Sequence, residues 1–198
     1  MKYILVLLII VFLSGCTTVV PPVTEYRIVT SKPNFVKNDG VCRDKSLKVA
    51  QPFSQSSLMS KDMNYAQGET KQYAYSQAQW SESPNIFVGA ELLNHIRATK
   101  LFKSVLNSKS RTKSDLILEI NIEDFMQYFN EDSTKSYCSV VIELTLLDSK
   151  NSKVIATQNF KARVDAKTLD ANGGVEALSK ALEKVIAQSV KWIGGVCK

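Results

Sequence analysis

The stretch DLILEINIEDF, residues 115–125, alternates apolar and polar side chains, which predicts a strand with one buried face. The same period of two returns in YCSVVIELTLL, residues 137–147, and again in residues 154–164. A polar loop at residues 130–136 and a turn at residues 148–151 join the three segments. Such short connections favour an antiparallel meander with one face in the core and the other in water.

A first helix is expected over about residues 84–99. Ser83 and Pro84 mark its start, because serine is a common N-cap and the fixed φ of proline suits the first helical position. Apolar residues at three- and four-residue spacing predict a buried stripe of Ile86, Gly89, Ala90, Leu93 and Ile96.

A second helix is expected over about residues 174–193. Asn172 or Asp170 is the candidate cap at its start, and Gly194-Gly195 is expected to end it. Its apolar stripe comprises Val175, Leu178, Leu182, Val185, Ile186 and Ile193.

Shorter strand signals lie before the first helix. Residues 26–30 and 47–53 each predict a strand, and residues 63–67 and 71–76 predict a hairpin around Gly68-Glu69. Together these elements predict an α+β fold, in which a mixed, largely antiparallel sheet carries two amphipathic helices packed on one face.

The composition is that of one globular domain. The chain has 198 residues, of which 44% are hydrophobic and 22% charged, and these values exclude wholesale disorder. Lysine and arginine number 25 against 19 acidic residues, a net charge of +6 with no run of five like charges, so no nucleic-acid partner is expected. A single histidine excludes histidine-rich metal sites and enzymes that need two histidines.

The amino terminus predicts export and lipidation. Lys2 precedes a continuous apolar run from Tyr3 to Leu13, which is too short to span a bilayer but has the length of a secretory signal core. The run ends in Leu13-Ser14-Gly15-Cys16, which resembles a bacterial lipobox. We therefore expect residues 1–15 to be removed and Cys16 to carry the lipid anchor; the alternative is an ordinary signal peptide with a chance cysteine.

The residues after Cys16 predict a short tether. Thr17 is not the aspartate that retains lipoproteins in the inner membrane of enteric bacteria, so the periplasmic face of the outer membrane is the expected destination. Residues 16–25 contain Pro21-Pro22 and span at most about 35 Å when extended. The single folded domain, residues 26–198, is therefore expected to lie close to the membrane.

Three further cysteines, Cys42, Cys138 and Cys197, remain for disulfide chemistry in an oxidising compartment. They allow three pairings. We favour Cys42 with Cys197, which would join the first core element to the carboxyl end, and expect Cys138 to be a buried free thiol.

No motif predicts catalysis, a metal site or a cofactor. His95 lies off the apolar stripe of its helix without a second histidine, so we interpret it as a solvated surface residue rather than a base or ligand. Glu119, Asn121, Glu123 and Asp124 imitate a carboxylate site, but their spacing fits the wet face of a strand. Activity on envelope lipids that depends on His95 would revive an enzymatic function.

The aromatic segment from Leu58 to Trp80 allows two interpretations. Tyr65, Tyr73 and Trp80 are expected to be core residues. Met59 and Met63 suit either the core or a contact with a partner, since flexible methionine is common at adaptable binding surfaces, and they are the candidate partner-contact residues.

With these elements in place, the chain resembles the ABC-type transport auxiliary lipoproteins (the PqiC-like family) over about residues 46–193. The departures are the three cysteines of the mature chain and Met59-Ser60-Lys61-Asp62. The resemblance is carried by Leu47-Lys48-Val49, Met63-Asn64-Tyr65, Tyr73-Ala74-Tyr75-Ser76-Gln77-Ala78-Gln79-Trp80, the helix at Pro84, Leu101-Phe102-Lys103-Ser104-Val105, Ser114-Asp115-Leu116-Ile117-Leu118 and the last helix through Trp192.

The resemblance implies a non-enzymatic partner of a lipid transport system. Its expected partners are an MCE-domain protein and ABC transporter subunits, its expected cargo is phospholipid, and a homo-oligomeric ring suits the role. No ligand residue is implied, because the family has no motif that marks one. The alternative is a structural lipoprotein that assembles another envelope complex, such as secretion or pilus machinery.

Overall fold

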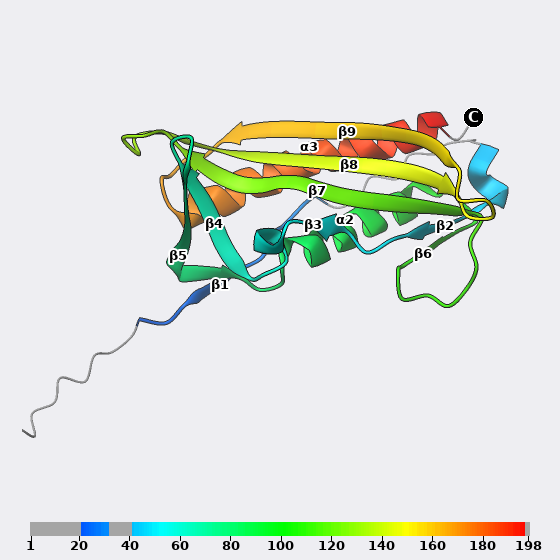
Figure 1. The fold of residues 1–198 in the computed structure, drawn as a ribbon, viewed down its shortest axis with the longest axis horizontal. Helices are drawn as coiled ribbons and strands as arrows, with labels where there is room; N and C mark the ends of the chain where they lie inside the picture. The colour runs from blue at the N-terminus through cyan, green and yellow to red at the C-terminus, as the bar shows by residue number, and fades with distance from the viewer. Residues whose placement is uncertain (1–20, 32–40, 197–198) are drawn as a thin grey trace, which may run out of the picture.

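The computed structural model describes residues 21–31 and 41–196 (Figure 1). The signal segment, Cys16 and Cys197 lie outside the described residues. The strands are β1 (Thr24–Tyr26), β2 (Ser46–Val49), β3 (Phe53–Ser54), β4 (Asp62–Gln67), β5 (Lys71–Trp80), β6 (Ser104–Leu106), β7 (Leu116–Phe129), β8 (Ser136–Asp148) and β9 (Val154–Asp165). The helices are α2 (Pro84–Thr99) and α3 (Ala171–Val196), with 3₁₀ turns η1 (Val41–Asp44) and η2 (Ser56–Leu58).

The predicted meander forms the long axis of the molecule. β7 and β8 are antiparallel from Leu116 opposite Asp148 to Phe129 opposite Ser136, and β8 continues antiparallel to β9. Even-numbered residues of β8 from 136 to 146 are buried toward the helices, whereas Tyr137, Val141 and Glu143 face the other side and are half-buried. We call the helix-covered side the inner face and the opposite side the outer face.

The segment before α2 pairs with β7 in parallel, which makes the sheet mixed. β2, β3 and β4 all run parallel to β7, and β4 and β5 form the predicted hairpin. Two strand predictions need correction. The strand expected at residues 26–30 lies at Thr24–Tyr26, and the one expected at residues 47–53 is divided before Phe53. Pro52 lies in that break, and its missing N–H removes a ladder donor.

The edge strands of the sheet differ in length. β1 and β6 are edge strands of three residues each, whereas β9 has twelve residues and, within the described chain, pairs only with β8. A bulge lies in β9 between the residues opposite Leu146 and Leu147, and it interrupts the regular edge near its start.

The helix α2 has the predicted bounds but is rotated from the predicted stripe. Gly89 and Ile96 are buried as expected, but Ile86 is 43% exposed, Ala90 is exposed and Leu93 is half-buried. The other buried helix residues are Pro84, Asn85, Val88, Leu92 and Thr99. Because apolar residues occur on more than one side of α2, the sequence pattern did not determine which side meets the sheet.

The helix α3 covers β8 and β9, and its predicted stripe is confirmed except for Val175, which is half-buried. Of the two candidate caps, Asp170 fills the role: its Oδ1 accepts the N–H of Gly173 at 2.8 Å. The helix continues through Gly194-Gly195 to Val196, so the predicted end is wrong. Burial of Ile193 on the sheet stabilises this last turn, which helix propensity alone would end.

Candidate functional site

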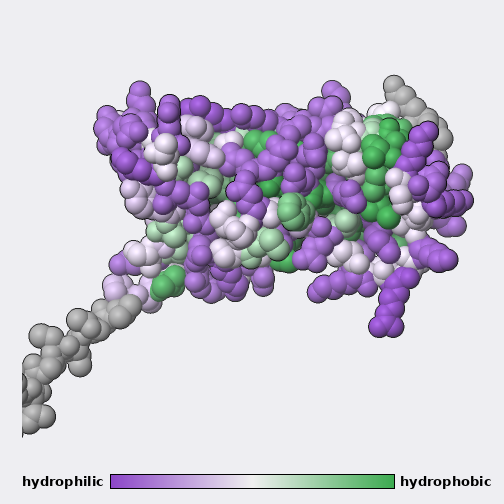
Figure 2. Space-filling model, in the orientation of Figure 1, coloured by the Kyte–Doolittle hydropathy of each residue, from purple (hydrophilic) through white to green (hydrophobic). Residues whose placement is uncertain are grey.

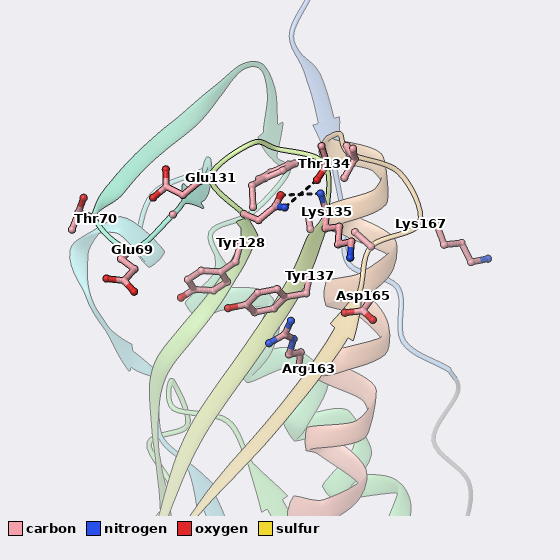
Figure 3. Close-up of a pocket in the computed structure, with 16 residues that line it drawn as sticks. Glu69, Thr70, Tyr128, Glu131, Thr134, Lys135, Tyr137, Arg163, Asp165 and Lys167 are labelled. Atoms are coloured by element: carbon pink, nitrogen blue, oxygen red, sulfur yellow. Dashed lines mark hydrogen bonds between the residues drawn. The ribbon is translucent and has the colours of Figure 1, made fainter.

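A hollow lies at one end of the sheet, below the tips of the β4–β5 and β7–β8 hairpins (Figure 3). Its volume is about 1000 Å³. We call it the end cavity. Figure 2 shows hydrophilic residues gathered over the hairpin tips, with more apolar surface toward the opposite end of the molecule.

The two hairpin tips that roof the end cavity are joined to each other. Gly68 has a φ of +63°, which glycine adopts without strain, and a Cβ added there would lie 2.0 Å from Glu131 Oε1. Gln67 Nε2 donates to the carbonyl of Glu131 and to Ser133 Oγ, both at 2.9 Å. Lys71 Nζ lies 3.5 Å from Glu131 Oε2. These contacts fix the roof by linking segments that are distant in sequence.

The wall of the end cavity is a row of three stacked side chains from β7, β8 and β9. The rings of Tyr128 and Tyr137 stack with centroids 5.2 Å apart and planes at 12°. The Cζ atom of Arg163 lies 3.3 Å from the centroid of the Tyr137 ring, a cation–π contact. All three project from the outer face, and Figure 3 shows Tyr137 between the other two.

Asp124 supports this row from the sheet. Its Oδ1 accepts the hydroxyl proton of Tyr128 at 2.9 Å. Burial raises the pKa of Asp124 above its usual value, although hydrogen bonds from Ser139 and Tyr128 act in the opposite direction. Burial, followed by the nearby carboxylate of Asp124, raises the pKa of Tyr128. Tyr128 is therefore a neutral hydrogen-bond donor at physiological pH.

Both signs of charge line the end cavity. Lys135, Arg163 and Lys167 contribute cations, and Asp165 and Glu69 contribute carboxylates. No carboxylate of the described residues lies within ion-pair distance of Lys135, Arg163 or Lys167. Figure 3 shows Lys135, Arg163 and Asp165 on the side of the tyrosines, whereas Lys167 points away from them.

Loop contacts place Lys135 at this position. Its backbone N–H donates to Asn130 Oδ1 at 2.9 Å, and Asn130 Nδ2 donates to Thr134 Oγ1 at 3.0 Å. The exposed side chain of Leu169, 48% accessible, is the main apolar group on the rim. A fixed loop, two rings and charges of both signs suit the binding of a polar, charged group rather than a hydrocarbon chain.

A buried polar chain lies on the inner side of the same strands. Tyr75 donates its hydroxyl to Gln127 Oε1 at 2.9 Å, and Gln127 Nε2 donates to Ser136 Oγ at 3.0 Å. Gly174 of α3 approaches closely, since a Cβ added there would lie 2.2 Å from Gln127 Oε1. Cys138 is a buried free thiol, as predicted, and donates to the carbonyl of Gly174 at 3.4 Å. Burial raises its pKa to about 12.

The two candidate partner-contact residues lie in different environments. Met59 is 52% exposed after η2, whereas Met63 in β4 is only 3% exposed and belongs to the core. The surface role suggested for Met63 is therefore corrected, because its side chain is covered by the apolar cluster. Trp80 is a core residue as predicted, but Tyr73 is 44% exposed and Tyr65 is half-buried against it with ring centroids 5.5 Å apart.

The other residues singled out by sequence are dispersed. His95 is less solvated than predicted, with 12% of its side chain exposed, and its Nδ1 lies 2.9 Å from the carbonyl of Glu91. Glu119 and Glu123 are exposed on the outer face as predicted, whereas Asp124 is partly buried. Cys42 is buried in η1, but the favoured pairing with Cys197 involves a residue outside the described part.

The described residues contain neither a metal-binding cluster nor a membrane-spanning helix. No group of three or more histidine, cysteine or acidic side chains is placed to hold a metal ion in residues 21–31 and 41–196. No helix within the same ranges is long and apolar enough to cross a membrane.

Comparison with protein families identifies the family of this chain. The family model of the ABC-type transport auxiliary lipoprotein component matches residues 32–189, which is most of the chain. The chain therefore belongs to this family, and the resemblance inferred from the sequence is confirmed. A comparison with curated proteins finds no match.

Solved structures share the fold. Protein XCC0632 from Xanthomonas campestris superposes with a TM-score of 0.77 at 18% identity, covering 87% of this chain and 96% of that one. An uncharacterised protein superposes with a TM-score of 0.67 at 12% identity, covering 87% of this chain and 99% of that one. The hypothetical protein CT253 from Chlamydia trachomatis gives 0.52 at 9% identity, covering 78% and 98%. At these identities the likeness establishes the fold alone.

Proposed function

We propose that this chain is a non-enzymatic docking component of an MCE-type ABC lipid transport system, anchored to the periplasmic face of the outer membrane. The observation that carries the proposal is the family match over residues 32–189. The expected partners are an MCE-domain protein and ABC transporter subunits, and phospholipid is the expected cargo. Self-association into a ring belongs to the same proposal.

Anchoring through Cys16 supports this role. The lipobox sequence ends at Cys16, Thr17 lacks the retention signal, and only nine residues separate Cys16 from Tyr26. The described chain begins at Pro21, at the same end of the molecule as the hairpin tips (Figure 1). With the anchor attached there, the end cavity is on the side of the domain nearer to the membrane.

The test is capture of the acylated protein from intact cells after chemical cross-linking, with identification of the captured proteins by mass spectrometry. Recovery of an MCE-domain protein together with transporter subunits is expected. A Cys16→Ser variant, which cannot be acylated, is the matched control and should recover them poorly. Recovery of secretion or pilus components in their place would contradict the proposal and support the assembly role.

Met59 is the proposed partner-contact residue. In the same capture experiment, Met59→Asp should reduce recovery of the MCE-domain protein several-fold, because a charge replaces an adaptable apolar contact. Val154→Asp is the matched control, since Val154 has a similar exposure, 54% against 52%, and lies at the start of β9. Equal recovery with both variants would exclude Met59 from the interface.

We also propose the disulfide between Cys42 and Cys197. Burial of Cys138 as a free thiol agrees with it, because that cysteine is then left out of the pairing. Proteolytic digestion without reduction should yield one cross-linked peptide that contains both residues. A peptide that joins Cys138 to either of them would contradict the pairing.

A further inference from the structure

The end cavity has features of a ligand site that the docking role does not use. Its wall is fixed, since Tyr128, Tyr137 and Arg163 stack across three hydrogen-bonded strands. Its roof is also fixed, because contacts between the hairpin tips hold Glu131 and Gln67 together. A cavity of about 1000 Å³ with preformed walls is large enough for a small ligand or a lipid headgroup.

The charges in the end cavity indicate which chemical group would bind. Arg163 and Lys135 are cations without an ion-pair partner among the described residues, and both lie beside the tyrosine row. Guanidinium and ammonium groups bind phosphate through charge-assisted hydrogen bonds. Asp165 lies on the same side, directly opposite Tyr137 in the sheet register. Its carboxylate suits a small ammonium group.

The position of the end cavity favours a ligand that comes from the membrane. Thr24 and Tyr26 of β1 share a second hollow with Asp170, Ala171 and Asn172 at the start of α3. Leu169, one residue earlier, stands on the rim of the end cavity. The chain that leads to the anchor therefore runs close to the cavity. Tyrosine, lysine and arginine beside an exposed leucine are the residues typical of a membrane–water interface.

We propose that the end cavity binds the headgroup of a zwitterionic phospholipid, with the phosphate held by Arg163 and Lys135 and the ammonium group held by Asp165. The inference rests on the proposed lipid-transport function, and it adds the ligand chemistry and the site. It requires no partner protein, so it is tested separately from docking. The polar lining leaves the acyl chains outside the cavity.

The experiment places a photoreactive p-benzoylphenylalanine at position 169 of the acylated protein in vesicles of phosphatidylethanolamine and phosphatidylglycerol. Tyr73 carries the same probe in the control, because its exposure is similar, 44% against 48%, and it does not line the cavity. After illumination, lipid adducts are quantified by mass spectrometry. Phosphatidylethanolamine adducts at position 169 should exceed those at position 73 by about tenfold.

Charge variants separate the two halves of the headgroup. Arg163→Gln or Lys135→Gln should lower adducts with both lipids, whereas Asp165→Asn should lower only those with phosphatidylethanolamine. Lys109→Gln, on an exposed loop away from the cavity, is the control that should change neither. Equal adducts at positions 169 and 73, or yields that do not respond to Arg163→Gln, would overturn the proposal.

A competition arm separates lipid from free phosphate. Millimolar inorganic phosphate should leave the adduct yield unchanged, since it lacks the ammonium group and the membrane location. Loss of the adducts in inorganic phosphate would show that the end cavity takes free phosphate, and would overturn the lipid assignment. The same vesicles without partner proteins are used throughout, so failed capture of an MCE-domain protein and failed headgroup binding are distinguishable outcomes.

Discussion

The inner and outer faces of the β7–β8–β9 sheet are built by the same three strands but have opposite compositions. On the inner face, Val140, Ile142 and Leu144 are fully buried under the helices. On the outer face, the exposed Arg163 stacks on the half-buried Tyr137, and Thr145 bonds to Thr157 at the surface. Burial on the inner face therefore supplies most of the stability of the sheet. Residues on the outer face can serve in binding, because the fold does not require them.

The sharpest comparison is between the two methionines near β4. Met63→Asp should destabilise the protein by about 4 kcal/mol or more, because it buries a carboxylate in an apolar cluster without a partner. Met59→Asp should change the free energy of unfolding by less than about 0.5 kcal/mol, since Met59 is 52% exposed. Urea denaturation measures both values. Similar losses would mean that Met59 is also a core residue.

Leu144 and Thr145 are neighbours in β8 that lie on the inner and outer faces of the sheet. Substitutions at the two positions therefore compare how much each face contributes to stability. Leu144→Ala should cost about 2–5 kcal/mol, because Leu144 is completely buried and the substitution leaves a cavity. Thr145→Ala removes a single exposed hydroxyl contact to Thr157, 3.1 Å long, and should cost less than about 1 kcal/mol. A small effect of Leu144→Ala in chemical denaturation would contradict the inner-face core.

Substitutions at two glycines of α3 compare the effect on stability of an added methyl group on the inner and outer sides of the helix. Gly174→Ala should destabilise by about 1–3 kcal/mol, because the new methyl group would meet Gln127 Oε1 at 2.2 Å and disturb the bonds to Tyr75 and Ser136. Gly195→Ala meets nothing within 4 Å and should leave stability unchanged or raise it by up to about 1 kcal/mol. Thermal unfolding of both variants checks the difference, and equal changes would refute the close approach at Gly174.

The smallest expected effect concerns the pH dependence of Asp124. Since burial raises its folded pKa, its stabilising contribution is fully present below the unfolded pKa, about 4, and is lost as pH rises through the folded value. Asp124→Asn should therefore gain stability relative to the parent as pH rises through the folded pKa of Asp124.

The pKa of Asp170 is shifted in the opposite direction, so its effect on the pH dependence of stability has the opposite sign. The N–H of Gly173 and the hydroxyl of Thr168 lower the pKa of Asp170, so its contribution is present above the unfolded pKa and is lost as pH falls through the folded value. Asp170→Asn should consequently lose stability relative to the parent as pH rises from the folded pKa of Asp170 toward the unfolded one. Denaturation curves at several pH values test both predictions. If the stabilities of the two variants relative to the parent changed in the same direction with pH, the predictions would be contradicted.

Local patterns predicted the local elements. Ser83-Pro84 fixed the start of α2, and strict alternation identified β7, β8 and the inner face. The parallel pairing of β2 and β4 with β7 was not predicted, because it depends on contacts between distant segments. The rotation of α2 was missed for a related reason: its apolar residues occupy several sides, and only packing selects among them.

Interpretation of the sequence did not identify the end cavity. Tyr128 lies beyond the strand predicted at residues 115–125, and only the bulge turns it to the outer face, where strand register brings it into one row with Tyr137 and Arg163. The bulge between Ile122 and Asp124 also shifts the alternation, so Asp124 became partly buried although its spacing grouped it with exposed residues. A search for aromatic and arginine residues facing each other across adjacent strands would have indicated the site.

The central position of β7 has a consequence for the order in which the chain folds. The strands β2, β3 and β4 precede β7 in the chain, and each pairs with it in parallel. A chain that emerges from its amino end would expose the β7-facing edges of these strands until β7 follows. Closure of such long loops slows folding. We expect the sheet to nucleate at the local β7–β8–β9 meander, so that the strands that precede α2 are among the last to become ordered.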